Sequence, residues 1–309
     1  MIHHVKASRP DALAAVSLAL SAAIFAGAPE QARAADAAPA PEIAQVPGDD
    51  IFGFTSPSDI GNPGDMAVAN ENDGRAGKRD GRYFALNQKL EISRTLTPDW
   101  WLAGSFFMAH NNARNVTGLP DVNRYQFDGF SFEIAHKLVN RDATNPFAVT
   151  LSAEPRWGRV DGVGGLRSNS WGATFKLFTD AIVVPDKLFW AGNIQATTQT
   201  SEDPAAPGEW IPGSTLLLST ALTWQAAQNL FLGAEARYFT TFDSASFHHP
   251  VGRALYIGPT LAWKITDKIV FNTTYQPQVS GHSAASRNQN LDLDNFERAQ
   301  FRLKLVVNF

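Results

Sequence analysis

The strongest constraint on the fold of this chain is an alternation of apolar and polar residues with a period of two. In the closing stretch FRLKLVVNF, apolar side chains occupy Phe301, Leu303, Leu305, Val307 and Phe309. The segments FAVTLSAEPRW (147–157) and LFLGAEARY (230–238) repeat this pattern. Because successive side chains of a strand point to opposite faces, the alternation predicts antiparallel strands with one apolar and one polar face.

The connections between the patterned segments alternate strictly between short and long. Short ones such as TPD, PDK and TDK are interleaved with long ones such as SEDPAAPGEWIPG and HSAASRNQNLDLDNF. A soluble sandwich has no reason to sort its loops by length, whereas a transmembrane β-barrel has short turns at one rim and long loops at the other. The sequence therefore predicts an all-β fold, an antiparallel transmembrane β-barrel over residues 51–309.

The strand count is expected to be even, so that both ends of the chain lie on one side of the membrane. Eleven strands follow from the pattern, near 82–95, 100–110, 125–139, 146–158, 170–184, 188–200, 214–226, 230–242, 254–265, 269–280 and 297–309. We predict twelve strands, with IFGFTSPSDI (51–60) as the candidate for the twelfth, although Pro57 disfavours a strand there. The alternative is ten strands with an irregular N-terminal segment folded into the lumen.

The N-terminal residues predict export. A positive start with His3, His4, Lys6 and Arg9 precedes an apolar run from Ala12 to Ala28 and the small-x-small site Ala32-Arg33-Ala34. This order is typical of a cleaved secretory signal peptide, here 1–34. An Ala/Pro-rich linker, 35–50, follows it.

Composition removes several classes of function. A net charge of −4 gives no sign of nucleic-acid binding, and the absence of cysteine excludes disulfides and thiolate metal sites. A mean hydropathy of −0.18 excludes a helical membrane bundle but suits a barrel, whose strands are only half apolar.

Two resemblances extend this interpretation. FRLKLVVNF resembles the C-terminal signature of bacterial outer-membrane β-barrel proteins, which in that class is read by the barrel-assembly machinery. GFTSPSDIGNPGD and GRAGKRDGRYFALNQKLEIS resemble a group of uncharacterised alphaproteobacterial outer-membrane transporters and, more distantly, an outer-membrane family associated with phenol degradation. The resemblances imply an outer-membrane location and passive transport, and they supply no motif with assigned chemistry.

Charged residues in the strands are expected to line the lumen, because Lys or Arg facing hydrocarbon near the membrane midplane costs about 2–4 kcal/mol. A backbone diameter of roughly 24 Å leaves a lumen about 10–12 Å wide. Eight basic and four acidic positions predict a mild preference for anions, unless the set is only an ion-pair lattice that stiffens the wall. The predicted lumen-lining residues are Lys89, Glu91, Glu133, Lys137, Glu154, Arg156, Lys176, Glu235, Arg237, Lys264, Arg302 and Lys304.

Aromatic residues near the strand ends predict two membrane-interface girdles, since Trp and Tyr favour that boundary. The residues assigned to the girdles are Trp100, Trp101, Trp157, Trp171, Trp190, Trp224, Trp263 and Phe309.

No catalytic or metal site is expected. His282 and Ser283 are adjacent, so in a strand they would point to opposite faces and could not act together. His248-His249 lacks nearby carboxylates, and Asp292 with Asp294 lacks the other oxygen ligands of a calcium loop.

The sequence thus predicts a monomeric outer-membrane channel that passes small polar or anionic solutes without a cofactor. Its expected partners are the lipid bilayer, lipopolysaccharide, the assembly machinery and the solute, and not nucleic acid. The alternative is a non-conducting barrel that acts as a structural or interaction protein through its outer loops.

Overall fold

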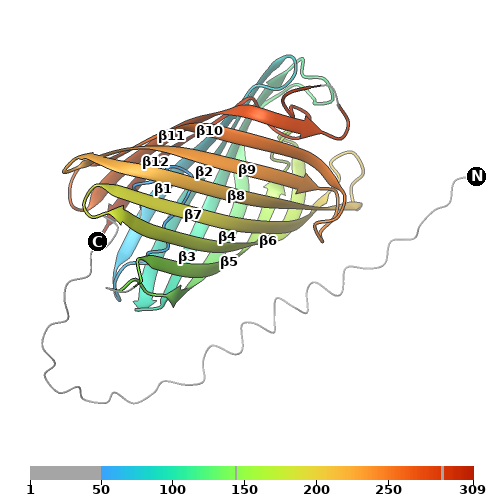
Figure 1. The fold of residues 1–309 in the computed structure, drawn as a ribbon. Helices are drawn as coiled ribbons and strands as arrows, with labels where there is room; N and C mark the ends of the chain where they lie inside the picture. The colour runs from blue at the N-terminus through green and yellow to red at the C-terminus, as the bar shows by residue number, and fades with distance from the viewer. Residues whose placement is uncertain (1–49, 143–144, 287–288) are drawn as a thin grey trace, which may run out of the picture. The chain divides into compact units, whose positions relative to one another are not determined.

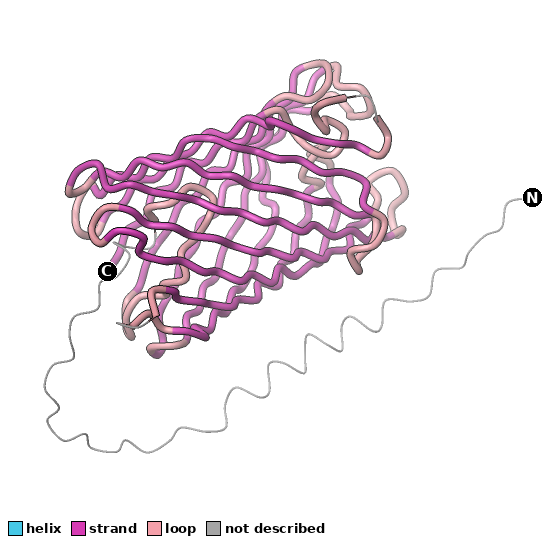
Figure 2. Tube along the Cα trace, viewed as in Figure 1, coloured by secondary structure: helices cyan, strands magenta, loops and turns pink. Residues whose placement is uncertain are grey.

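In a computed structural model of the chain, residues 50–142, 145–286 and 289–309 are described. The predicted signal peptide and all of the predicted linker except Asp50 lie outside these ranges. Over the described residues the chain is built of strands and loops (Figure 2). No helix in these ranges is long and apolar enough to cross a membrane.

Twelve antiparallel strands form a closed barrel in which each strand pairs with its sequence neighbours (Figure 1). The strands are β1 (Met66–Ala76), β2 (Arg82–Thr97), β3 (Trp100–Arg114), β4 (Val122–Val139), β5 (Phe147–Val160), β6 (Arg167–Val184), β7 (Leu188–Glu202), β8 (Trp210–Ala227), β9 (Leu230–Phe242), β10 (Pro250–Lys264), β11 (Ile269–Ser283) and β12 (Ala299–Asn308). The predicted fold class and strand number are confirmed.

The barrel closes between its first and last strands. β1 and β12 pair without interruption from Ala67 opposite Asn308 to Ala76 opposite Ala299. The backbone N–H of Phe309 donates to the carbonyl of Met66 at 2.9 Å. Closure leaves no row of unpaired backbone groups, as a lipid environment requires.

The first strand is not the one that the sequence suggested. The segment 51–60 is not a strand, and β1 runs instead through MAVANENDGRA. From Asn70 to Arg75 this stretch has no apolar side chain on either face, and it contains Asn, Asp and Gly, which are depleted in strands, so it gives no apolar alternation. The luminal N-terminal segment proposed with the ten-strand alternative is present, but inside a twelve-stranded barrel.

The barrel is apolar outside and polar inside. Exposed side chains on its outer face include Phe106, Phe175, Ile194, Leu222 and Tyr275, which are 46–59% exposed. The inner face carries buried charged and amide groups such as Glu133, Asp180, Arg237 and Gln276. This is the inverse of a soluble protein, and it is the arrangement expected of a barrel surrounded by lipid.

Candidate functional site: the lumen

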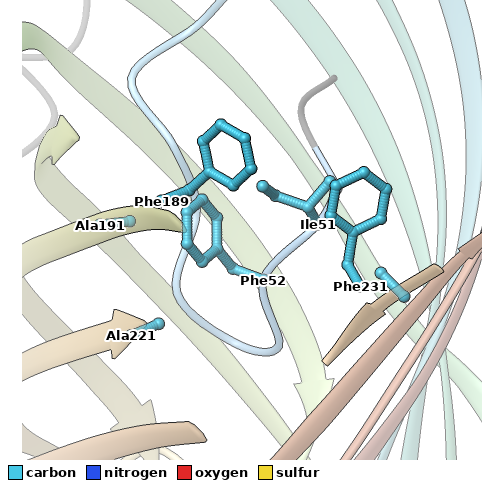
Figure 3. Close-up of a cluster of buried hydrophobic side chains, with 7 residues drawn as sticks. Ile51, Phe52, Phe189, Ala191, Ala221 and Phe231 are labelled. Atoms are coloured by element: carbon cyan, nitrogen blue, oxygen red, sulfur yellow. The ribbon is translucent and has the colours of Figure 1, made fainter. Parts of the chain in front are cut away.

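The lumen is partly filled by the segment that precedes β1, residues 50–62, which we call the luminal segment. At its start, Ile51 and Phe52 are 1% exposed and pack against Phe189 and Phe231 (Figure 3). The small residues Ala191, Ala221 and Ala262 make room for them on the barrel wall. This apolar patch lies beside the short turns, so the luminal segment is anchored there by hydrophobic burial.

A buried carboxylate holds the middle of the luminal segment. Glu235, 2% exposed, accepts hydrogen bonds from the backbone N–H of Phe54 at 2.8 Å and from the N–H and hydroxyl of Thr55 at 2.5 Å each. Gln276 donates to the same carboxylate at 2.8 Å and accepts from Arg237 at 2.7 Å. The Glu235 carboxylate therefore binds the luminal segment directly and is linked to Arg237 through Gln276.

Two arginines stack on Phe54 of the luminal segment. The guanidinium carbon of Arg237 is 3.4 Å from the ring centroid, and that of Arg302 is 4.6 Å away. Arg237 belongs to β9 and Arg302 to β12, so the ring connects two parts of the wall. Cation–π contacts of desolvated groups stabilise such an arrangement by about 2 kcal/mol or more each.

The second half of the luminal segment is bound by hydrogen bonds from several strands. Ser56 donates its N–H to Asn193 at 2.8 Å and accepts in return at 2.7 Å. Ser58 donates its N–H and hydroxyl to Asp180 at 2.6 and 2.7 Å. Thr150 donates to the carbonyl of Ser58 at 2.5 Å, and Thr95 donates to that of Ile60. These bonds satisfy backbone groups of Ser56, Ser58 and Ile60 inside the barrel.

Glu71 on β1 is the centre of one charge cluster on the wall. It lies 2.9 Å from Arg302, 3.6 Å from Lys89 and 3.9 Å from Lys304. Further carboxylates complete the cluster: Asp73 pairs with Arg302 through two bonds of 2.7 Å, Glu91 with Lys89 at 2.5 Å, and Asp50 with Lys304 at 2.5 Å. Each cation thus has at least one partner, which buried charges require.

Lys176 on β6 is the centre of a second cluster. Its ammonium group lies 2.8 Å from Glu133 and 2.6 Å from Glu154. Hydroxyls complete the shell, since Ser152 donates to Glu133 and Ser131 to Glu154, both at 2.6 Å. One cation between two carboxylates leaves this part of the wall with a net negative charge.

The remaining predicted lumen residues lie apart from the two clusters. Arg156 pairs with Asp128 and covers the ring of Phe107 at 3.9 Å. Lys137 lies 3.6 Å from Asp59 of the luminal segment. Lys264 is half-buried near the short-turn end, 5.7 Å from the ring centroid of Phe231.

A cavity of about 410 Å³ remains between the luminal segment and the wall. It extends from Ala67, Trp101 and Asn308 at the short-turn rim up to Arg156 and Thr197. Its charged lining consists of five basic residues, Lys89, Arg156, Lys176, Arg302 and Lys304, and seven acidic residues, Asp50, Asp59, Glu71, Asp73, Glu91, Glu133 and Glu154.

This balance reverses the predicted excess of basic groups. Four of the acidic residues, Asp50, Asp59, Glu71 and Asp73, lie on the luminal segment and β1, which the pattern of alternation did not place. Arg237 is absent from the lining because it is buried against Phe54. The argument for an anion preference therefore fails.

Loops fold over the long-loop end of the barrel. Tyr256 donates to the carbonyl of Glu297 at 2.7 Å, and Glu297 lies 3.4 Å from Lys78 and 3.5 Å from Arg75. Burial lowers the pKa of Lys78, although the Glu297 carboxylate opposes the shift. Burial also raises the pKa of Asp292, which is 0% exposed and hydrogen-bonded to Asn295.

Most predicted girdle aromatics lie on the outer face. At the short-turn rim, Trp100, Trp224, Trp263 and Phe309 are 40–69% exposed, and Trp190 donates to Thr220 at 2.9 Å. Toward the long loops, Trp157 contacts Trp171, with ring centroids 6.4 Å apart. Trp101 differs from the expectation, because it lines the cavity. Adjacent residues of a strand point to opposite faces, so Trp100 and Trp101 cannot both face lipid.

Several lumen residues were missed by the sequence reasoning. Asp180 has the same inward parity as Lys176 on β6, so the signal for it was present in the alternation. Asp128 gave no such signal, because a register irregularity in β4 near Gly129 changes the parity along the strand. Phe54 and Glu71 were missed with the luminal segment and β1.

The side chains considered for chemistry are not arranged for it. Ser283 donates to Asp294 at 2.6 Å, whereas His282 is exposed. Within the described ranges, no three His, Asp or Glu residues are grouped so that they could hold a metal ion.

The fold and the two faces define a twelve-stranded barrel of the outer-membrane type. Residues 44–309 match a family described as a family of unknown function (DUF6662), and the chain belongs to that family. No curated protein sequence matches it.

Among solved structures, the chain is similar to the COG4313 outer membrane channel from Pseudomonas putida F1, with 8% identity and a TM-score of 0.60 over 82% of this chain and 98% of that one. It is also similar to the NanC porin, with 12% identity and a TM-score of 0.46 over 78% and 98% of the two chains. The translocator domain of the autotransporter NalP from Neisseria meningitidis matches with 12% identity and a TM-score of 0.46 over 82% and 91%. At these identities the similarity concerns the fold.

Proposed function

We propose that the protein is an outer-membrane channel that lets small polar solutes diffuse passively through the barrel. The observation that carries the proposal is the cavity beside the luminal segment, which is lined by paired positive and negative groups. Such a lining replaces the hydration of a polar solute without holding it tightly, because each charge already has a partner. The name of the Pseudomonas putida structure, an outer membrane channel, supports the same function.

The luminal segment sets the size of the solute in this proposal. It occupies part of a lumen that is only about 10–12 Å wide. What remains suits ions and small organic molecules. Conductance of the purified, folded protein in a planar lipid bilayer tests the proposal, and a folded protein that neither conducts nor speeds solute uptake into liposomes would reject it.

The charge balance of the cavity predicts weak cation selectivity. With seven acidic and five basic groups in the lining, we expect K⁺ to be more permeant than Cl⁻, measured as a reversal potential in a KCl gradient. Replacing two lining carboxylates in E91Q/D59N should move the potential toward anion selectivity. The matched control is D203N in an outer loop, which should leave it unchanged. A clear preference of the wild type for Cl⁻ would contradict the prediction.

A second candidate function is a barrel that does not conduct and acts through its outer loops. The observation that favours it is the filling of the lumen from both ends, by the luminal segment and by the buried residues Asp292, Leu293 and Phe296 of the loop before β12. If the outer loops carry the function, shortening loop 203–209 should reproduce the phenotype of a strain that lacks the protein. The permeability of the outer membrane to small solutes should stay unchanged.

We propose that the chain reaches the outer membrane through a cleaved signal peptide, 1–34, and that its terminal strand is recognised by the barrel-assembly machinery. Its apolar face would contact the bilayer, and its outer loops lipopolysaccharide. Replacing Phe309 with Ser should slow assembly, measured as the fraction of protein in the folded form.

A further inference from the structure

One part of the outer face does not fit a surface covered by hydrocarbon. Asn70 and Asn72 of β1 and Gln88 of β2 have the outward parity of Val68 and Leu90, and all three are half-buried. Asn72 and Gln88 are paired with each other, and the other neighbours across the pairing are apolar, with Asn70 between Leu90 and Leu305. We call these three residues together with Tyr125 the amide strip.

The amide strip lies within the apolar band. Met66, the first residue of β1, receives a hydrogen bond from Phe309 at the short-turn rim. A strand rises about 3.3 Å per residue, and a tilt of about 40° converts this to roughly 2.5 Å of height. Asn70 and Asn72 are thus about 10 and 15 Å from that rim, near the middle of a band about 25 Å tall.

The side chains of the strip form a chain of hydrogen bonds. Tyr125 donates to Gln88 at 2.8 Å, Gln88 to Asn72 at 3.1 Å, and Asn72 to Asn70 at 2.6 Å. Tyr125 is 58% exposed, but its hydroxyl donates its hydrogen bond to Gln88 of the strip. The amide NH₂ of Asn70 donates no hydrogen bond among the described residues, so the chain ends on a group that hydrocarbon cannot satisfy.

The strip is confined to one side of the barrel. On β7 and β9 the mid-strand outward residues are small or apolar, as Ile194, Ala196, Leu232 and Ala234 illustrate. A lateral exit for solute does not explain the strip, because β1 is paired at every position with β2 and from Ala67 onward with β12. The amide groups of the strip therefore need a polar partner on the lipid-facing side of the barrel to complete their hydrogen bonds.

We propose that the amide strip is the contact surface for a second copy of this chain, so that the protein is a dimer in the membrane. A primary amide both donates and accepts, so one strip can satisfy another across a two-fold axis, as an isologous interface requires. The midplane of the membrane offers no lipid headgroup or water to do the same. The exposed Leu90 and Phe106, which lie opposite each other on β2 and β3, supply apolar contact beside the strip. The proposed dimer differs from the monomer expected from the sequence.

The absence of cysteine in the chain allows a direct test by cross-linking. L90C places a thiol on the outer face beside the intact strip. I194C is the matched control, because β7 lies opposite β1 in the strand order and Ile194 is exposed on its outer face. With a short bifunctional maleimide in liposomes, L90C should give at least about ten times more covalent dimer than I194C.

A second experiment replaces the three amide side chains of the strip with leucine. N70L/N72L/Q88L should abolish the L90C cross-link and convert the purified protein from dimer to monomer by native mass spectrometry. T179L, an outward change on β6, should leave the dimer intact. Heat-modifiable migration on gels verifies folding, and N72L alone serves if the triple variant does not fold.

Three results would overturn the proposal. The first is a monomeric wild type with no L90C cross-link above the I194C control. The second is a cross-link that persists in a folded strip variant. The third is a glycolipid or an unrelated protein that copurifies on this face in place of a second copy.

Discussion

Deleting residues 51–62 is expected to raise the single-channel conductance at least about threefold, because the luminal segment fills much of a lumen only about 10–12 Å wide. Its removal empties the region around Phe54 and the apolar patch formed by Phe189 and Phe231. Glu235 and Asp180 lose their partners on the segment, but water that enters the widened lumen can solvate them. The measurement is conductance in planar bilayers at fixed salt.

The control for this deletion is the removal of residues 204–208 from the outer loop between β7 and β8, which should leave the conductance unchanged. A narrower variant keeps the chain length. A side chain at Gly53 would meet Glu235, Thr260 and Thr274, so G53V should displace the segment and raise the conductance partway. If the folded deletion variant conducts no better than the wild type, the luminal segment does not limit the pore.

K176M is expected to lower the free energy of unfolding by about 3–5 kcal/mol, because it leaves the carboxylates of Glu133 and Glu154 near each other without their shared cation. Lys176 is only 13% exposed, so solvent offers little screening. The measurement is urea unfolding of the protein in lipid vesicles. The triple variant K176M/E133Q/E154Q removes the charges together and should recover most of the loss.

The contrast between these two variants is the decisive comparison. If both lose the same stability, the loss reflects packing of the long side chain and not uncompensated charge. Equal stability of K176M and the wild type would show that the cluster is solvated. Because Lys176 also lines the cavity, the reversal potential of K176M should shift toward cations under the proposed function.

The alternation of apolar and polar residues was sufficient to predict the strands of the barrel wall wherever lipid contact requires one face to be apolar. It placed eleven strands near their observed positions and gave the inward parity of Glu133, Glu154 and Lys176. It failed for β1, whose outer face carries Asn70 and Asn72, and for Asp128, where a register irregularity changes the parity. Both failures occur where the outer face is polar or the pairing is irregular, so that the physical basis of the pattern is absent.

The role of the luminal segment could not be obtained from local sequence. IFGFTSPSDI has the apolar character of a strand, and only the inner wall shows that Ile51 and Phe52 pack against Phe189 and Phe231. The net negative charge of the cavity lining also depends on the position of the luminal segment and β1. Together they bring four acidic residues into the lining: Asp50, Asp59, Glu71 and Asp73.

The sequence by itself determined a closed antiparallel barrel and eleven of its twelve strands, because side-chain direction along a strand is local and the lipid environment requires closure. Tertiary structure decided which residues meet inside the barrel, how much space the luminal segment leaves, and that amide groups gather on one side of the outer face. These depend on strand register and on contacts between residues such as Thr55 and Glu235, which are far apart in the chain. No periodic pattern within a single strand contains that information.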